Sequence, residues 1–227
     1  MTSPIRVAIV EDEPLYRGLL EHYLAQHPRL SVVGAYADGV TALTEAPDQN
    51  PDVVTLDIEL PGRMDGIQTA LALRKRLPQL GIVILSNHAD PRFLGVLPRE
   101  VTSGWSYLLK KSVSKVEVLD RAVEGAAAGT VTLDPAIVAG MRPKPGGALA
   151  RLTRRQREIL GLVASGLSNA AIAEQLVLAE KSVENQLTAI YGELGLDRRD
   201  GTAIHPRVSA VLAYLTDSRV APGGAAR

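Results

Sequence analysis

Short runs of β-branched and other aliphatic residues, each ending at a polar side chain, limit most strongly how the front of this chain can fold. They occupy residues 5–10, 30–36, 52–56, 81–85 and 105–109. Segments with apolar residues at helical spacing lie between them, so strand and helix alternate. Short, continuously apolar strands are typical of a parallel sheet covered on both faces. The pattern predicts an α/β fold with a doubly wound, five-stranded parallel sheet of flavodoxin-like order.

Polar residues follow four of these strands at the point where each strand ends. Glu11 and Asp12 follow the first strand, Asp57 the third, Ser86 the fourth and Lys110 the fifth. The carboxyl ends of parallel strands meet at one edge, so we expect these side chains to converge. Three adjacent carboxylates suit Mg²⁺, and a carboxylate beside a cation, a hydroxyl and a lysine can attack a phosphoryl group. Any one of the five could be an ordinary solvated loop residue, but that interpretation does not explain all five together.

Charge is divided unevenly in a chain that is neutral overall. Residues 1–141 hold 13 Lys and Arg against 17 Asp and Glu, whereas residues 142–227 hold 12 against 8. An acidic front and a basic rear predict two domains with different partners, the rear partner being anionic. The chain has no cysteine, which excludes disulfides, thiolate nucleophiles and cysteine-type zinc sites.

Nothing in the sequence predicts a membrane segment. The longest uncharged stretch, residues 159–173, contains Gly, Ser and Asn and is too short to span a bilayer. At the N-terminus, acidic residues follow the apolar run immediately, unlike the pattern of a signal peptide. We therefore expect a soluble, cytoplasmic protein without membrane association.

From residue 152 onward the pattern is helical. Thr153 and Gln156 form a capping-box signature ahead of one helix, and Ser168 is the expected N-cap of the next, over residues 169–176. A further helix is expected from about residue 181 to 194, after a four-residue turn. One face of that helix is apolar and forms the expected buried stripe of Val183, Leu187, Ile190 and Leu194.

Two short helices joined by a tight turn, the second with a polar outer face, predict a helix-turn-helix. The second of these helices is expected to end at Gly195, which favours the left-handed conformation of a helix C-cap. Shape alone would also suit a small structural bundle of helices.

Four motifs of the front half resemble the signature of a response-regulator receiver domain, over residues 5 to about 128. They are V-E-D at 10–12, D-I-E-L-P-G-R-M-D-G at 57–66, L-S at 85–86 and Y-L-L-K at 107–110. The resemblance implies that Asp57 is the phosphoacceptor. It also implies that the protein is not otherwise an enzyme, since a receiver catalyses only its own phosphoryl transfer and dephosphorylation.

The resemblance assigns roles to the residues around Asp57. It implies a Mg²⁺ site made by the side chains of Glu11, Asp12 and Asp57 and the backbone carbonyl of Glu59. Lys110 would pair with the phosphoryl oxygens, and Ser86 would swing in to hydrogen-bond them. Tyr107 matches the aromatic switch position, which turns inward when Ser86 moves.

The rear half closely resembles the LuxR-type DNA-binding domain over residues 152–176 and 181–195, so the whole chain resembles a NarL/FixJ-family response regulator. The resemblance implies that Glu184, Asn185 and Thr188 read base edges, while Lys181 and Ser182 lie near phosphates. It further implies double-stranded promoter DNA and a sensor histidine kinase as partners. A homodimer formed through the last helix, residues 206–216, is expected in the active state.

Several positions depart from these family patterns. Glu59 places an acid beside Asp57, Asn87 replaces a small residue next to Ser86, and Pro98 interrupts the expected fourth helix of the receiver. In the rear half, Ala179 replaces the usual N-cap serine of the recognition helix. Lys181 is the sole basic residue on that helix, so attraction to DNA phosphates would have to come from elsewhere: Arg154, Arg155, Arg157, Arg198 and Arg199.

These observations predict a transcription factor whose sequence-specific DNA binding is controlled by phosphorylation of Asp57. The expected organisation is a receiver over 1–128, a short helix and linker over 129–151, an all-α four-helix DNA-binding domain over 152–217 and a flexible tail over 218–227. The departures leave open a phosphorylation-independent regulator controlled by a ligand or partner. A Mg²⁺-dependent aspartyl-phosphate phosphatase is a weaker alternative, because it leaves the rear half unexplained.

Overall fold

The computed structural model describes residues 3–87, 103–113, 116–196 and 205–220. The described residues divide into two compact units, a front unit of the residues up to 87 together with those of 103–132, and a rear unit of the residues from 133 onward. Among the described helices, none combines the length and apolar character that crossing a bilayer requires.

The front unit is built on a parallel sheet with the strand order β2-β1-β3-β4-β5-β6. Its first five strands are β1 (Ile5–Val10), β2 (Leu30–Tyr36), β3 (Val53–Asp57), β4 (Gly81–Ser86) and β5 (Trp105–Leu109). The pairs β1–β2, β1–β3, β3–β4 and β4–β5 are all parallel. The predicted doubly wound α/β fold is therefore confirmed, and the carboxyl ends of β1, β3, β4 and β5 lie at one edge.

The predicted number of strands was wrong by one. A sixth strand, β6 (Val131–Leu133), lies beside β5, and all three of its residues are buried. Three residues are too few to show a periodicity, so the sequence there indicated only the helix that follows. That helix, α6 (Pro135–Gly140), begins after Asp134, whose carboxylate accepts a hydrogen bond from the Ala136 N–H at 2.8 Å.

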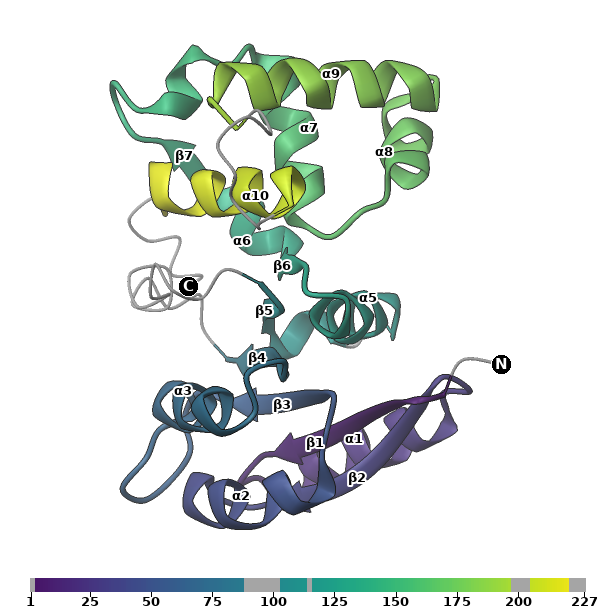
Figure 1. The fold of residues 1–227 in the computed structure, drawn as a ribbon, viewed down its shortest axis with the longest axis vertical. Helices are drawn as coiled ribbons and strands as arrows, with labels where there is room; N and C mark the ends of the chain where they lie inside the picture. Colours follow the sequence, from purple (N-terminus) through teal and green to yellow (C-terminus); the bar gives the residue numbers. More distant parts are fainter. Residues whose placement is uncertain (1–2, 88–102, 114–115, 197–204, 221–227) are drawn as a thin grey trace. The chain divides into compact units, whose positions relative to one another are not determined.

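Helices cover both faces of the sheet (Figure 1). Helices α1 (Pro14–Gln26) and α5 (Val116–Ala127) lie on one face and share a core with the strands. Helices α2 (Gly39–Glu45) and α3 (Gly66–Arg76) contact each other on the opposite face. The expected weakness of the fourth receiver helix around Pro98 falls within residues 88–102, outside the described residues.

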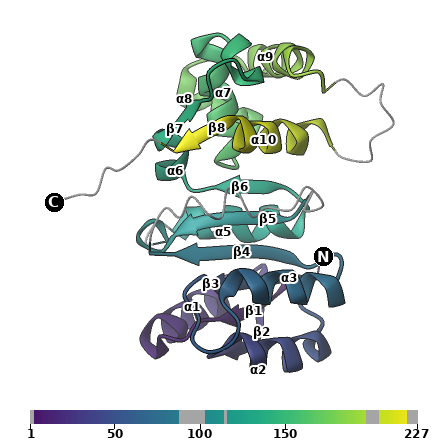
Figure 2. The ribbon, with the colours of Figure 1, turned by 90° about the vertical axis from the view of Figure 1, so that its left-hand side faces the viewer.

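The rear unit is helical, with α7 (Arg154–Ala164), α8 (Asn169–Leu176), α9 (Glu180–Glu193) and α10 (Pro206–Asp217) following α6 (Figure 2). The predicted caps are present. Thr153 and Gln156 form a reciprocal capping box, and the Ser168 hydroxyl accepts a hydrogen bond from the Ala171 N–H at 3.2 Å. Gly195 follows α9 with φ +69°, the left-handed conformation expected of a helix C-cap.

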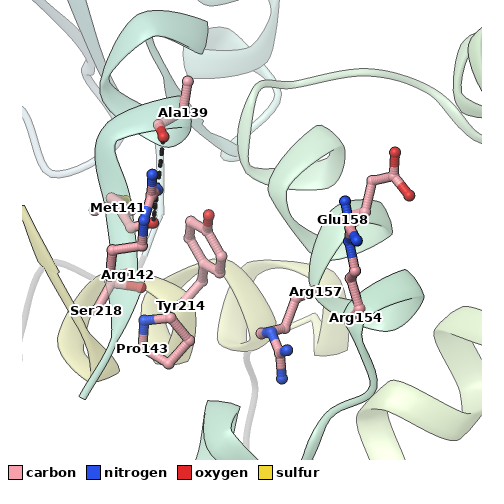
Figure 3. A pocket seen from close by; sticks show the side chains of 9 residues that line it. All are labelled: Ala139, Met141, Arg142, Pro143, Arg154, Arg157, Glu158, Tyr214 and Ser218. Carbon is pink, nitrogen blue, oxygen red and sulfur yellow. Dashed lines mark hydrogen bonds between the residues drawn. The ribbon is translucent and has the colours of Figure 1, made fainter. Parts of the chain in front are cut away.

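Short strands lie within the segments expected to be the linker and the tail. The strands β7 (Met141–Pro143) and β8 (Ser218–Val220) pair antiparallel, so the tail begins with structure. Asp217 at the end of α10 explains this order. Its carboxylate accepts from the Leu149 N–H at 2.7 Å, and its backbone carbonyl accepts from the Lys144 N–H at 2.8 Å. A pocket of about 690 Å³ lies beside β7 and the ends of α7 and α10 (Figure 3).

Val177, in the turn between α8 and α9, has an unfavourable backbone conformation. Its φ of +53° and ψ of 52° are left-handed, although the residue is β-branched. Its side chain is 91% exposed, so packing does not compensate for the strain. A β-branched residue in this region is costly because Cβ crowds the following carbonyl.

We expect Val177→Asn to stabilise the rear unit by about 1 kcal/mol, because asparagine tolerates the left-handed conformation. Calorimetric unfolding of the full chain measures the change. Val177→Ala serves as the control, since it removes the branch but keeps a Cβ, and should give a smaller gain. Equal or lower stability of the asparagine variant would contradict the assignment of strain.

Candidate functional site

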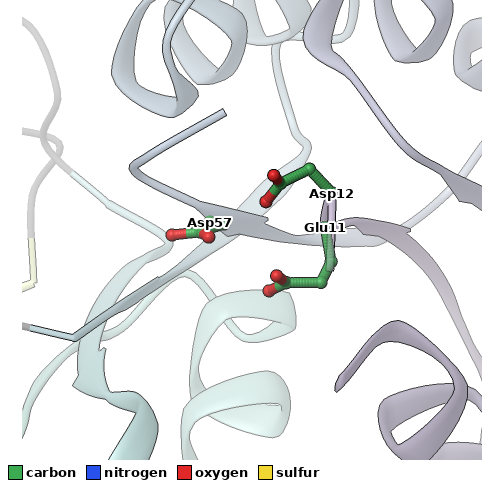
Figure 4. A group of neighbouring side chains, drawn as sticks. All are labelled: Glu11, Asp12 and Asp57. Atoms are coloured by element: carbon green, nitrogen blue, oxygen red, sulfur yellow. The ribbon is translucent and has the colours of Figure 1, made fainter. Parts of the chain in front are cut away.

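Three carboxylates meet at the carboxyl edge of the sheet. Glu11 and Asp12 directly follow β1, and Asp57 ends β3. One oxygen of each lies within 4.8 Å of the others, and Figure 4 shows the three groups facing a common space. Glu11 and Asp57 are buried, at 0% and 3% exposure, while Asp12 is exposed. The predicted convergence of these three side chains is therefore present in the structure.

Lys110 balances part of this negative charge. Its Nζ donates to Glu11 Oε1 and to Asp57 Oδ2, each at 2.8 Å, and its side chain is 8% exposed. Burial lowers the pKa of Lys110, but the hydrogen bonds to Asp57 and Glu11 outweigh that effect and raise the pKa above its ordinary value. The lysine is therefore a fixed positive charge bridging two strands.

The site carries more negative charge than Lys110 compensates. Burial is the largest influence on Glu11 and raises its pKa. The hydrogen bond from Lys110 lowers the pKa and repulsion from Asp57 raises it, and the net result is a pKa above the ordinary value. Glu11 Oε2 is buried and has no hydrogen-bond partner among the described residues. A buried, unpartnered carboxylate oxygen beside two further carboxylates is a donor set that fits a hard divalent cation such as Mg²⁺.

Backbone geometry fixes Asp57 in this position. Its Oδ1 accepts a hydrogen bond from the Glu59 N–H at 3.1 Å. Gly66, the first residue of α3, lies so close that a Cβ there would be 1.8 Å from the Asp57 carbonyl oxygen. Asp65 caps the same helix through a reciprocal capping box with Gln68. Glycine at 66 therefore allows α3 to begin directly against the strand that carries Asp57.

Ser86 and Tyr107 lie on neighbouring strands, β4 and β5. Both are buried, with Ser86 at 2% and Tyr107 at 1% exposure. In the strand register, Ser86 is opposite Leu109, the residue before Lys110. Ser86 is thus placed at the same edge as the carboxylates. Glu59 and Asn87, the two departures beside Asp57 and Ser86, have exposed side chains.

Sequence reasoning missed two residues of α1 that contact this site. The Tyr16 ring lies 4.7 Å below Lys110 Nζ, a cation–π distance. Arg17 Nη1 donates to the backbone carbonyl of Glu11 at 2.6 Å. Tyr16 precedes the buried Leu20 and Leu24 at four-residue spacing, so the helical periodicity could have placed it on the inner face.

In the rear unit, α9 presents the predicted polar face. Val183, Leu187 and Ile190 are buried, whereas Leu194 at the helix end is half-buried. The five predicted DNA-contacting residues all have exposed side chains: Lys181, Ser182, Glu184, Asn185 and Thr188. Ala179 occupies the N-cap and offers no side-chain acceptor, as expected.

An ion pair occupies part of that face. Lys181 Nζ donates to Glu184 Oε2 at 2.8 Å, one turn along the helix. The hydrogen bond with Glu184 raises the pKa of Lys181, which is fully exposed. The Thr188 hydroxyl donates to the Glu184 backbone carbonyl at 3.0 Å. In the protein without DNA, Glu184 therefore offsets the positive charge of Lys181.

Comparison with known families and proteins identifies this architecture. The model of the response regulator receiver domain matches residues 7–123, and that of the luxR family of bacterial regulatory proteins matches residues 150–205. The chain is a response regulator. It belongs to the class that joins a receiver to a LuxR-type DNA-binding domain, as its motifs had indicated.

Full-length relatives share both parts of this response regulator. The DNA-binding transcriptional activator DevR/DosR of Mycobacterium tuberculosis is 33% identical over 88% of this chain and 93% of its own length. The transcriptional regulatory protein LiaR of Bacillus subtilis is 30% identical over 88% and 96%. A solved structure of two RcsB dimers bound to two parallel DNAs has the same fold, with a TM-score of 0.53 and 22% identity over 95% and 99%.

For this response regulator we expect Lys110→Met to lower the thermal stability in the absence of metal, because Glu11 and Asp57 lose their buried counter-charge. Adding Mg²⁺ should then raise the unfolding temperature of the variant more than that of the wild type, since the ion replaces the lost positive charge. Thermal unfolding with and without Mg²⁺ measures both effects. A smaller response to Mg²⁺ in the variant would show that the carboxylates do not form a cation site.

Lys111→Met is the matched control, because its side chain is exposed and neighbours the same strand end. Its response to Mg²⁺ should equal that of the wild type.

Proposed function

We propose that Asp57 accepts a phosphoryl group from a sensor histidine kinase and that this modification controls DNA binding by the rear domain. The observation that carries the proposal is the environment of the Asp57 carboxylate. It is buried at a strand end, beside two further carboxylates, and Lys110 Nζ donates to it at 2.8 Å. Few structural roles need such a concentration of like charges in one buried place.

The transfer follows from the chemistry of these groups. An oxygen of the ionised Asp57 attacks the phosphorus of a phosphohistidine, the P–N bond breaks, and the imidazole of the kinase leaves with its electron pair and takes up a proton. Glu11, Asp12 and Asp57, with the backbone carbonyl of Glu59, would hold Mg²⁺. When bound, the ion supplies positive charge that lowers the repulsion between the carboxylates and the phosphoryl oxygens.

Lys110 and Ser86 would hold the product. Once Asp57 carries the phosphoryl group as an acyl phosphate, the Lys110 ammonium loses one ionised carboxylate partner and can donate to the phosphoryl oxygens instead. Ser86, at the same edge of the sheet, would donate its hydroxyl to another of these oxygens. Tyr107, which is 1% exposed, is the proposed switch residue, because it lies on the strand next to the one that ends at Ser86.

We assign DNA binding to the outer face of α9. Lys181 and Ser182 would lie near backbone phosphates, and Glu184, Asn185 and Thr188 would contact base edges in the major groove. We further propose that the active form is a homodimer on double-stranded promoter DNA and acts in the cytoplasm. Support comes from the family match of the rear domain and from relatives that are transcriptional regulators.

The proposed domain limits are 1–128 for the receiver and 152–217 for the DNA-binding domain. Residues 129–151 would join them, and residues 218–227, which begin with β8, would form the tail. The family matches to residues 7–123 and 150–205 support these limits.

Phosphorylation is tested with a small phosphodonor and Mg²⁺, followed by mass spectrometry of the intact protein. We expect the mass of one phosphoryl group on the wild type and none on Asp57→Asn. Asp52→Asn is the matched control, because Asp52 is an exposed acid at the opposite end of the same strand, and it should be modified like the wild type. No added mass on folded wild-type protein with several donors would favour control by a ligand or partner.

The role of Glu184 is tested by Glu184→Lys and Glu184→Gln, measured on a cognate duplex and on random-sequence duplexes. If Glu184 accepts a hydrogen bond from a cytosine amino group, both variants should lose roughly 1–3 kcal/mol of preference for the cognate site. Both should also bind random DNA more tightly, because Lys181 is freed from its ion pair. A uniform gain in affinity, with the ranking of sequences unchanged, would mean that Glu184 only repels phosphates.

A further inference from the structure

The pocket beside β7 has no part in the phosphoryl chemistry or in the DNA-reading face of α9. It lies wholly within the rear unit and has a volume of about 690 Å³. Figure 3 shows Arg142, Tyr214 and Ser218 on one side of it and Arg154, Arg157 and Glu158 on the other. Volumes of this size are typical of small-molecule sites.

The charge around the pocket is strongly positive. Three arginines line it, Arg142 from β7 and Arg154 and Arg157 from the first turn of α7. The one acidic residue in the lining, Glu158, accepts a hydrogen bond from Arg155 Nη1 at 2.7 Å, and Arg155 is not part of the lining. Glu158 is therefore already paired, and the three guanidinium groups form a net positive surface.

The position of these arginines is unfavourable without an anion. The N-terminus of a helix carries the positive end of its dipole, so cations in the first turn are destabilising there. Helix α7 begins at Arg154, and its neutral capping box from Thr153 and Gln156 brings no negative charge. An anion in the pocket would be attracted both by the guanidinium groups and by the helix dipole.

Two of the arginines are held in place by the backbone. Arg142 Nη1 donates to the carbonyls of Ala139 and Met141, each at 2.8 Å. Arg157 Nη1 donates to the Leu152 carbonyl. Since a guanidinium has five N–H donors, each still has donors for a ligand. Fixed guanidinium groups lose little side-chain entropy when they bind an anion.

The rest of the lining offers a hydroxyl group and apolar side chains to an organic ligand. Ser218 is 7% exposed, and its buried Oγ has no hydrogen-bond partner among the described residues. Tyr214 is 8% exposed and lines the pocket together with Met141 and Pro143. The pocket thus combines guanidinium groups with an apolar wall and an unused hydroxyl.

We propose that this pocket binds a phosphorylated small molecule with at least two phosphate groups and an attached organic moiety. The phosphates would contact Arg154 and Arg157 at the start of α7 and Arg142 across the pocket. The organic moiety would pack against Tyr214 and Pro143. Such a ligand would give the DNA-binding domain a second chemical input, independent of Asp57.

The test uses the full chain without Mg²⁺, so that the carboxylate site takes no phosphate, and measures binding of inorganic pyrophosphate and of ADP by calorimetric titration. We expect both to bind, ADP more tightly because of its organic moiety. Arg154→Gln combined with Arg157→Gln should weaken ADP binding at least tenfold, and Arg142→Gln, from a different element, should also weaken it. Arg151→Gln is the matched control, because Arg151 is an exposed arginine outside the lining of the pocket, and it should leave the affinity unchanged.

Three results would overturn the proposal. One is no binding of pyrophosphate or ADP at millimolar concentration to folded protein. Another is equal loss of affinity in Arg151→Gln, which would show that only the overall charge matters. The third is a result in which the wild type does not bind ADP and the double variant of Arg154 and Arg157 loses binding to random-sequence duplexes. That result would assign these arginines to DNA phosphates.

Discussion

The contact that organises the front unit is the bridge from Lys110 to Glu11 and Asp57. It connects three parallel strands, β1, β3 and β5, at the ends where their polar residues meet. Without that ammonium, two buried carboxylates would face each other in a medium of low dielectric constant, and one would have to take up a proton. The lysine leaves Glu11 Oε2 without a hydrogen-bond partner among the described residues, so the site remains deficient in positive charge. In the function that we propose, that deficit makes the site receptive to a cation and then to a phosphoryl group.

The sequence predicted this site well because strand ends are defined by the chain itself. Each apolar run stops where a polar residue begins, and parallel topology brings those stops to one edge, so Glu11, Asp57, Ser86 and Lys110 could be placed without coordinates. Tyr16 was missed because it lies on a helix, where its contact with Lys110 depends on how α1 packs on the sheet. The strands β6, β7 and β8 were missed because each has three residues, too few to show an alternation of apolar and polar side chains. Whether such short strands form depends on tertiary contacts such as those of Asp217.

Helix α9 shows that predicting which residues are exposed does not predict the interactions that they make with one another. Its exposed face is the one predicted from the buried stripe, yet the ion pair between Lys181 and Glu184 could not be inferred from the face alone. An exposed pair of this kind is weak, because water and salt screen it. The pair nevertheless places a negative charge one turn from the one basic residue of α9. In the function that we propose, affinity for the phosphate backbone therefore comes mainly from other elements, and α9 discriminates between sequences.

Two of the places where local rules of protein stability are broken coincide with proposed sites. Glu11 keeps a buried oxygen that has no hydrogen-bond partner among the described residues, and Arg154 and Arg157 lie at the positive end of a helix dipole. In both places the missing partner has the opposite charge, which is the arrangement expected where a ligand completes the structure. Val177 is different, because its strain is in the backbone and its side chain is exposed, so a bound ion cannot relieve it. Unmet charge, rather than strain in general, is therefore the feature that points to ligands in this molecule.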